Sequence, residues 1–201
     1  MASLQTAVEN LKKHGFDARA FETGEEAAAA ALELIGSRSV GFGGPVTLRD
    51  LGIYPRLKAQ GNTAWFAKGF SGDDVPDVYL RAQGAQVFLL SSNAVTENGY
   101  LVNIDGRGNR VAGLIFGHEE VIVIAGKNKL VENVEEGVKR IKGYAAGLNA
   151  RRLGAKTPCA VDLKCHDCRS KDRICRSIVI SECPPMGMKV SVFLVNEDLG
   201  Y

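Results

Sequence analysis

Five cysteines lie close together near the end of the chain, and their spacing is the strongest chemical signal in the sequence. Four of them form the pattern Cys159-x5-Cys165-x2-Cys168-x6-Cys175, and Cys183 follows after seven further residues. A Cys-x2-Cys pair lets one metal ion bind two thiolates, and two more cysteines complete a four-sulfur set. The same four thiolates can hold an iron–sulfur cluster. The sequence therefore predicts zinc or an iron–sulfur cluster at these four cysteines, or alternatively a group of unmetallated thiols.

Basic side chains surround these cysteines throughout the cysteine-rich segment, residues 151–184. They are Lys164, Arg169, Lys171, Arg173 and Arg176. Positive charge lowers the pKa of a neighbouring thiol, so this surrounding favours a reactive or electron-accepting centre. The alternative interpretation is a basic, solvated loop around inert thiols.

Three other segments place glycine or polar residues directly after an apolar run, namely residues 41–47, 91–97 and 126–129. In an open parallel sheet, ligands bind beyond the carboxyl ends of the strands. Each segment is otherwise an ordinary turn at a strand end. The candidate ligand-binding residues are Gly43, Gly44, Thr47, Ser91, Asn93, Thr96, Asn103, Gly106 and Asn128. The candidate catalytic residues are Glu97, Asp105 and Lys127, with Lys129 as a second lysine that could contact an anion.

The stretch from residue 93 to residue 106 is the most distinctive part of the domain. Asn98-Gly99 is a strong turn signal between two apolar runs. Glu97, Asn103 and Asp105 offer carboxylate and amide groups within a short span. The structural alternative is a polar hairpin whose Asn and Asp side chains stabilise turns.

The apolar pattern predicts the elements that must position these residues. Short β-branched runs separated by helices indicate parallel strands that are covered on both faces. The predicted strands are residues 16–21, 39–42, 63–67, 87–90 and 121–124. Apolar residues at helical spacing predict a helix over residues 134–148, packed on that sheet. Residues 177–180 and 190–195 are expected to form a closing pair of strands. We expect one α/β domain over residues 1–201, with an open, mostly parallel sheet.

Composition limits the function classes. The chain has 201 residues, is 45% hydrophobic and 24% charged, and carries a formal net charge of +2. Because its Lys and Arg are spread rather than clustered, nucleic-acid binding is not expected. The first residues lack signal-peptide features and no apolar run is long enough for a membrane span. We therefore expect a cytoplasmic protein, in which reduced cysteines point to metal or redox chemistry rather than to disulfides.

The chain resembles the lactate-utilisation (LUD) domain family in several segments. They are Gly41-Phe42-Gly43-Gly44, residues 91–106, Arg107-Gly108-Asn109-Arg110 and residues 122–129, and the resemblance extends through the cysteine segment. It implies a fold similar to ribose-5-phosphate isomerases and CoA transferases. The sequence departs from these relatives at Pro45, where LUD proteins usually carry Ser, and at Asn93, where the isomerases carry a catalytic Asp. An amide cannot act as a general base, which argues against isomerase chemistry.

The resemblance implies a role in the metabolism of small organic acids of the lactate type. The expected protein is a redox-associated component with a small anionic metabolite in its pocket and an iron–sulfur or redox protein as its partner. Exposed strands near the C-terminal end are compatible with a homodimer. Two alternatives stay open: a stand-alone isomerase or transferase for a sugar phosphate or CoA ester with structural zinc, and a ligand sensor without catalysis.

Overall fold

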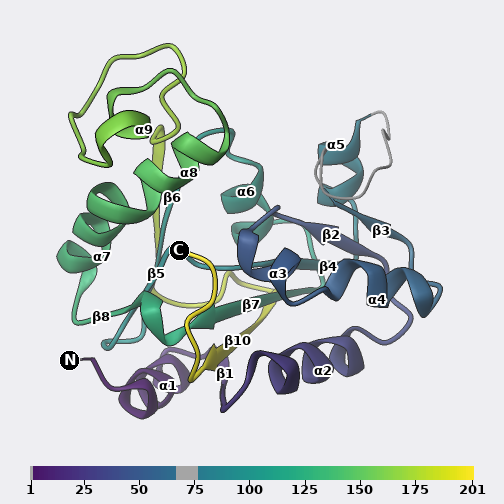
Figure 1. The fold of residues 1–201 in the computed structure, drawn as a ribbon. Coiled ribbons are helices and arrows are strands. Elements are labelled where there is room, and N and C mark those ends of the chain that lie inside the picture. Colours follow the sequence, from purple (N-terminus) through teal and green to yellow (C-terminus); the bar gives the residue numbers. More distant parts are fainter. Residues whose placement is uncertain (1, 67–76) are drawn as a thin grey trace.

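A six-stranded parallel sheet forms the centre of the computed structural model, which describes residues 2–66 and 77–201. In spatial order its strands are β1 (Asp17–Phe21), β10 (Lys189–Val195), β7 (Glu120–Gly126), β4 (Val87–Leu90), β2 (Val40–Phe42) and β3 (Ala64–Trp65). Every neighbouring pair in this sheet is parallel. The expected α/β fold with a mostly parallel sheet is therefore confirmed (Figure 1).

Helices cover both faces of the parallel sheet. One face packs against α2 (Gly24–Ile35), α3 (Val46–Asp50) and α4 (Ile53–Ala59), and the other against α1 (Leu4–Lys13), α5 (Val78–Gln83) and α6 (Asn109–Ile115). Successive residues of β7 point to opposite faces: Ile122 and Ile124 belong to the first core, whereas Val121 and Val123 belong to the second. Continuous burial of this kind explains why the central strands are apolar along their whole length.

A second, smaller sheet lies beside the first and has mixed strand directions. Its order is β8 (Leu130–Val131), β5 (Ala94–Thr96), β6 (Leu101–Asp105) and β9 (Ser177–Ser181). β5 and β6 form an antiparallel hairpin across the turn at Gly99, as the sequence predicts. β6 also pairs antiparallel with β9, whereas β5 pairs parallel with β8.

The helix predicted over residues 134–148 is present, but it packs on the second sheet rather than on the parallel one. It comprises α7 (Val134–Arg140), a π-helical turn η2 (Ile141–Ala145) and α8 (Ala146–Arg152). Ile141 forms a small apolar core with Ala94 and Val102 of the hairpin. The periodicity gives the buried face of a helix but does not say which sheet covers it, so this part of the prediction was wrong.

The expected pairing of the last two strands was also wrong. β10 lies inside the parallel sheet between β1 and β7, whereas β9 is an edge strand of the second sheet. The side chains give the physical reason. β10 is buried on both faces from Val190 onward, but β9 exposes Ile178 and Ile180, so only β10 suits a central position.

The cysteine-rich segment, residues 151–184, begins at the end of α8 and includes β9. It contains the short helix α9 (Pro158–Asp162) and then runs without regular structure to residue 176 (Figure 1). In the part of the chain that the structure describes, no helix is both long enough and apolar enough to cross a membrane.

Candidate functional site

A cavity of about 600 Å³ opens beyond the carboxyl ends of the central strands. Its walls come from the loops after β2 and β4, the end of β6 with the start of α6, the turn η1 (Lys127–Lys129) after β7, α8 and the cysteine-rich segment. This volume lies within the usual range for a small-molecule site. The position agrees with the general rule for ligand sites in open α/β sheets.

Positive charge dominates the lining of this pocket. Among residues 2–66 and 77–201, two carboxylates face it, Asp105 and Asp172. Seven basic side chains of the described residues line it: Arg107, Arg110, Lys129, Arg152, Lys171, Arg173 and Arg176. Such an excess of positive charge in a concave site attracts anions and provides charge-assisted hydrogen bonds to carboxylate or phosphate groups.

Three of the strand-end loops meet at the side chain of Lys129. Its Nζ donates a hydrogen bond to Thr47 Oγ1 at 2.9 Å and another to Ser91 Oγ at 2.8 Å. These partners lie after β2 and β4, whereas Lys129 lies after β7. All three side chains are buried and line the pocket. The three loops therefore converge, and the residue at which they meet is Lys129.

The environment of Lys129 disfavours its charged form. Burial, reinforced by the positive charges of Arg140 and Arg110, lowers the pKa of Lys129 to about 7, and Asp50 opposes the shift. In the described part of the chain, no carboxylate forms an ion pair with its Nζ. An amine with this pKa is neutral in about half of the molecules near pH 7.

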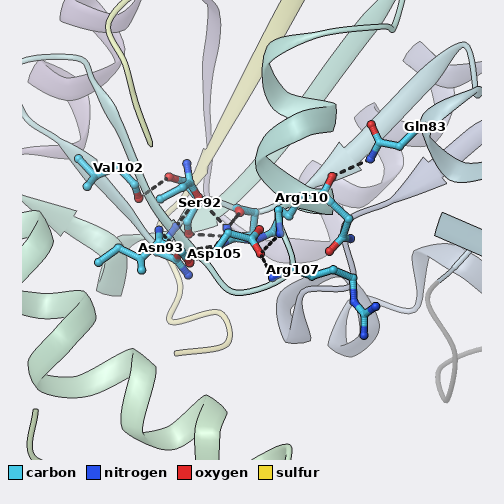
Figure 2. Close-up of polar contacts among 12 residues, drawn as sticks. Gln83, Ser92, Asn93, Val102, Asp105, Arg107 and Arg110 are labelled. Atoms are coloured by element: carbon cyan, nitrogen blue, oxygen red, sulfur yellow. Dashed lines mark hydrogen bonds and ion pairs between the residues drawn. The ribbon is translucent and has the colours of Figure 1, made fainter. Parts of the chain in front are cut away.

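Arg110 holds the end of β6 against the loop after β4 (Figure 2). Its guanidinium donates to the Oδ1 atoms of Asn93 and Asn103, at 2.7 Å each. It also donates to the carbonyl oxygens of Ser91 and Ile104. Because Arg110 donates these hydrogen bonds to other residues of the chain, its main role is to hold the pocket wall in place.

Asp105 faces the pocket from the end of β6. Its Oδ1 accepts hydrogen bonds from the backbone N–H groups of Arg107 and Gly108, at 3.1 and 3.0 Å. Its Oδ2 lies 3.5 Å from Arg110 Nε and, among the described residues, accepts no hydrogen bond. Figure 2 shows Asp105, Asn93 and Arg110 grouped on this wall. Asp105 is thus the one predicted catalytic residue that lines the pocket.

The other predicted residues divide into two groups. Gly43, Gly44, Thr47, Ser91, Asn93 and Gly106 line the pocket together with Asp105. Thr96, Glu97, Asn103, Lys127 and Asn128 do not line it. Among these, Asn103 supports the wall through its hydrogen bonds with Arg110 and Asn93.

The residues outside the pocket have other partners. Thr96 Oγ1 accepts from the N–H of Tyr100 in the hairpin turn, and Glu97 Oε1 accepts from the N–H of Ser3 before α1. Lys127 is exposed and contacts Asn196 at 3.4 Å. The expectation that Glu97 and Lys127 belong to the pocket fails because their side chains leave the strand-end loops toward other elements.

Residues 197–201 lie across the strand ends as a strap. Asn128 binds this segment through two contacts, accepting from the N–H of Leu199 at 3.1 Å and donating to the carbonyl of Gly200 at 3.1 Å. Thr47 Oγ1 donates to the carbonyl of Leu199 at 3.3 Å. The Tyr201 side chain lines the pocket and its hydroxyl accepts from Arg152 Nε at 2.7 Å. Asn128 therefore positions the strap that covers Thr47.

The four cysteines predicted as metal ligands line one small cavity of about 30 Å³. They are Cys159, Cys165, Cys168 and Cys175, whereas Cys183 is exposed and lies outside it. All five are free thiols. Among residues 2–66 and 77–201, however, no three His, Cys, Asp or Glu side chains are grouped so that they could hold a metal ion. The segment thus gathers its cysteines around a common space without forming a closed coordination set.

The thiol of Cys175 departs from the expectation for a basic surrounding. Burial raises the pKa of the Cys175 thiol, and the nearby thiols of Cys159 and Cys165 raise it further. The positive charges of Arg173 and Lys142 oppose this change but do not outweigh it. The predicted lowering of thiol pKa values is therefore wrong for this cysteine, because burial exceeds the effect of the neighbouring charges.

The cysteine cavity and the cationic pocket share a wall. Arg173, Ile174 and Cys175 line both, together with Ala146 of α8. Arg173 fixes this wall by donating to the carbonyl oxygens of Cys168 and Cys175, at 2.6 and 2.7 Å. A group bound by the cysteines would therefore lie next to a ligand in the pocket.

The LUD domain model matches residues 4–195. The chain belongs to the LUD domain family. Its structure is also similar to the crystal structure of a DUF162 family protein from Deinococcus radiodurans, with a TM-score of 0.54 and 14% sequence identity. That alignment covers 96% of this chain and 95% of the other chain. At this identity the similarity shows a common fold only. A comparison with curated proteins finds no match.

The sequence of this LUD domain does not indicate the structural roles of two arginines, and of the two lysines after β7 it is Lys129 that lines the pocket. Arg110 stands out in the sequence only as part of a segment that resembles the family, and no sequence signal marks Arg140. Arg140 binds the carbonyl oxygens of Asn128 and Asn93 at 2.9 and 2.8 Å. The loop after β7 offered both Lys127 and Lys129, and no sequence signal says which of them turns inward.

Proposed function

We propose that this LUD-domain protein binds a small organic anion of the lactate type and works as a redox-associated component of organic-acid metabolism. The observation that carries the proposal is the charge of the strand-end pocket, in which the described part of the chain places seven basic side chains and two carboxylates. An anionic ligand would neutralise part of this excess and accept hydrogen bonds from its donors. The lactate-type class itself comes from the family resemblance.

The second candidate is a larger anion such as a sugar phosphate or a CoA ester. The volume of about 600 Å³ favours it, because a three-carbon acid would fill only part of such a cavity. The side chain of Asn93 weighs against isomerase chemistry at this position. Its Oδ1 accepts from Arg110 and from the N–H of Ile104, so this amide has a structural role.

The cysteine cavity supports the redox part of the proposal. Four thiols around one space, separated from the pocket by a shared wall, fit a single common occupant. Four thiolates can serve zinc or an iron–sulfur cluster alike, and the choice of the cluster comes from the redox association that the family resemblance implies. Such a cluster would supply one-electron transfer, and a redox protein would be its partner.

The exposed Ile178 and Ile180 on edge strand β9 support the expectation of a homodimer.

Binding measurements test the anion pocket. Isothermal titration with lactate, pyruvate and ribose 5-phosphate should detect binding of at least one anion, weakening as salt increases. Arg107→Met should lower its affinity by about tenfold, since one charge-assisted contact is worth about 1.4 kcal/mol. Arg169→Met is the matched control because Arg169 does not line the pocket. No binding by any of the three anions, or equal losses in both variants, would contradict the proposal.

Metal analysis tests the cysteine site. Protein purified without oxygen should contain iron and sulfide and show a broad brown absorption. Cys175→Ser should lose both, whereas Cys183→Ser should keep them because Cys183 lies outside the cavity. One zinc per chain without colour would favour structural zinc, and no metal would rule out the metal site.

A further inference from the structure

Lys129 is a buried amine that the proposed anion binding does not explain. A simple anion site is best served by exposed or permanently charged donors such as Arg. Lys129 instead lies 3% exposed at the base of the pocket, where its Nζ contacts only the hydroxyls of Thr47 and Ser91 among the described residues. Among the described residues no carboxylate forms an ion pair with this amine, so burial of its charged form is poorly compensated.

The hydrogen-bond directions are compatible with a neutral amine. The Thr47 hydroxyl donates to the carbonyl of Leu199, and the Ser91 hydroxyl donates to the carbonyl of Ser92 at 3.4 Å. Both hydroxyl oxygens are then free to accept from Lys129. A neutral amine has two N–H groups and one lone pair. Two accepted hydrogen bonds use both N–H groups and leave the lone pair available for reaction.

We propose that Lys129 forms a Schiff base with an anionic carbonyl compound, of the 2-oxo acid class, bound in the strand-end pocket. The lone pair of Nζ attacks the carbonyl carbon, and the C=O bond is replaced by a C=N bond. Both N–H hydrogens leave with the carbonyl oxygen as one molecule of water, so no oxidant or reductant is needed. The anionic group of the substrate is held by the basic lining, so the proposal rests on the proposed anion pocket for its choice of substrate.

The surroundings of Lys129 give it the reactivity that this step needs. Its pKa of about 7 results first from burial and then from Arg140 and Arg110, against the weaker opposite effect of Asp50. A solvated lysine has a pKa near 10.4, so at pH 7 Lys129 has about a thousandfold larger neutral fraction than a surface lysine. Desolvated lysines next to other cations are known nucleophiles toward carbonyl carbon. Thr47 and Ser91 are positioning residues that orient Nζ.

Reductive trapping tests this assignment. The full chain is incubated at pH 7 with glyoxylate and cyanoborohydride, digested and mapped by mass spectrometry. We expect a carboxymethyl group on Lys129 well before any other lysine. Lys129→Arg should abolish the early label, whereas Lys127→Arg should keep it, since Lys127 is exposed and lies outside the pocket. Early label spread over many lysines, or none on Lys129, would overturn the proposal.

Two further measurements distinguish failure of the Lys129 assignment from failure of the proposed anion pocket. The labelling rate of Lys129 in the unmodified chain should have its midpoint near pH 7, and a midpoint near pH 10 would overturn the proposal without relying on a variant that must fold. Acetaldehyde should label Lys129 at least tenfold more slowly than glyoxylate does, because it lacks the anionic group. Equal rates would leave Lys129 as a reactive amine but overturn its selection of anions, and with it the proposed anion pocket.

Discussion

Lys127 and Lys129 are two residues apart in one turn, but their side chains lie in opposite environments. Lys127 is exposed, whereas Lys129 is buried between two hydroxyls. A 3₁₀ turn has about three residues per turn, so positions two apart point in clearly different directions. Of the two amines, only Lys129 reaches the other strand-end loops.

Burial of Lys129 should appear in the pH dependence of stability. Its pKa is about 7 in the folded protein and near 10.5 when solvated, so between these values the unfolded chain binds the extra proton. The free energy of unfolding of the unmodified protein should therefore rise with pH in this window, relative to Lys129→Met, by up to about 1.4 kcal/mol per pH unit. Urea unfolding at pH 7, 8, 9 and 10 measures the difference. Lys127→Met should show no such trend, and a flat difference for Lys129→Met would contradict the shifted pKa.

Arg110 should be the most sensitive charged residue of the pocket wall. Arg110→Met leaves several buried acceptors without their donor and removes the cation that lies 3.5 Å from the Asp105 carboxylate. We expect a loss of about 3–5 kcal/mol in the free energy of unfolding, because breaking a buried, fully bonded cation is costly. Arg107→Met removes a cation that lies over the Tyr79 ring and should cost at most about 1 kcal/mol. Similar denaturation midpoints for the two variants would argue against this role of Arg110.

The sequence shows which residue types could form the site, but it does not show where their side chains point. Glycines and polar residues after apolar runs mark Gly43, Thr47 and Ser91, which line the pocket. Glu97 and Lys127 were misplaced because side-chain direction in an irregular loop depends on which elements pack nearby. Contacts between distant segments, such as Ser3 with Glu97, leave no periodic trace in the sequence.

At the scale of elements, the hairpin of β5 and β6 is locked to α1 through its turn. Asn10 donates from Nδ2 to the carbonyl of Glu97 at 2.8 Å. Gly99 has a φ of +90°, and a Cβ there would lie 2.7 Å from the backbone carbon of Asn10. The turn therefore needs glycine both for its conformation and for the close approach of the helix.

Comparing Gly99→Ala with a control glycine separates the need for a left-handed conformation from the need for space beside α1. It should lower the free energy of unfolding by about 2–4 kcal/mol, from strain in the left-handed region plus a collision with α1. Gly61→Ala is the matched control, since Gly61 has a φ of +85° and its Cβ would meet no described atom within 4 Å. The control should lose only about 1 kcal/mol. Equal losses, measured by thermal or urea denaturation, would show that α1 can move away from the turn.

The element types were predictable where one physical signal was sufficient. The capping box of Thr23 and Glu26 starts α2, and its spacing can be read in the sequence because it is a local hydrogen-bond pattern. The buried strands β4 and β7 follow from their apolar runs. The second sheet was not predicted as a separate layer. Its pairing of β6 with β9 joins residues more than seventy positions apart, and such pairing depends on tertiary packing.

At the scale of the whole molecule, stability should be uneven. β7 is buried along its whole length between β10 and β4, whereas β9 is a partly exposed edge strand beside the cysteine-rich segment. Local opening is easiest where few apolar contacts must be broken.

Hydrogen–deuterium exchange followed by mass spectrometry should show this gradient. Amides of β7 and β10 should exchange most slowly, near the rate set by global unfolding. Amides of β9 and of residues 163–176 should exchange much faster. Protection of β9 equal to that of β7 would mean that the two sheets open as one unit, contrary to this expectation.

The central position of β10 also has a consequence for folding of the chain during its synthesis. β1 pairs with β10 alone in the parallel sheet, and β10 separates it from β7. While residues 189–195 are still untranslated, β1 has no neighbour and β7 presents an unpaired apolar edge. Such edges promote association with other chains, and pairing between distant segments is slow. The parallel sheet therefore cannot form completely until β10 has left the ribosome. We expect chaperone binding to matter most just before that point.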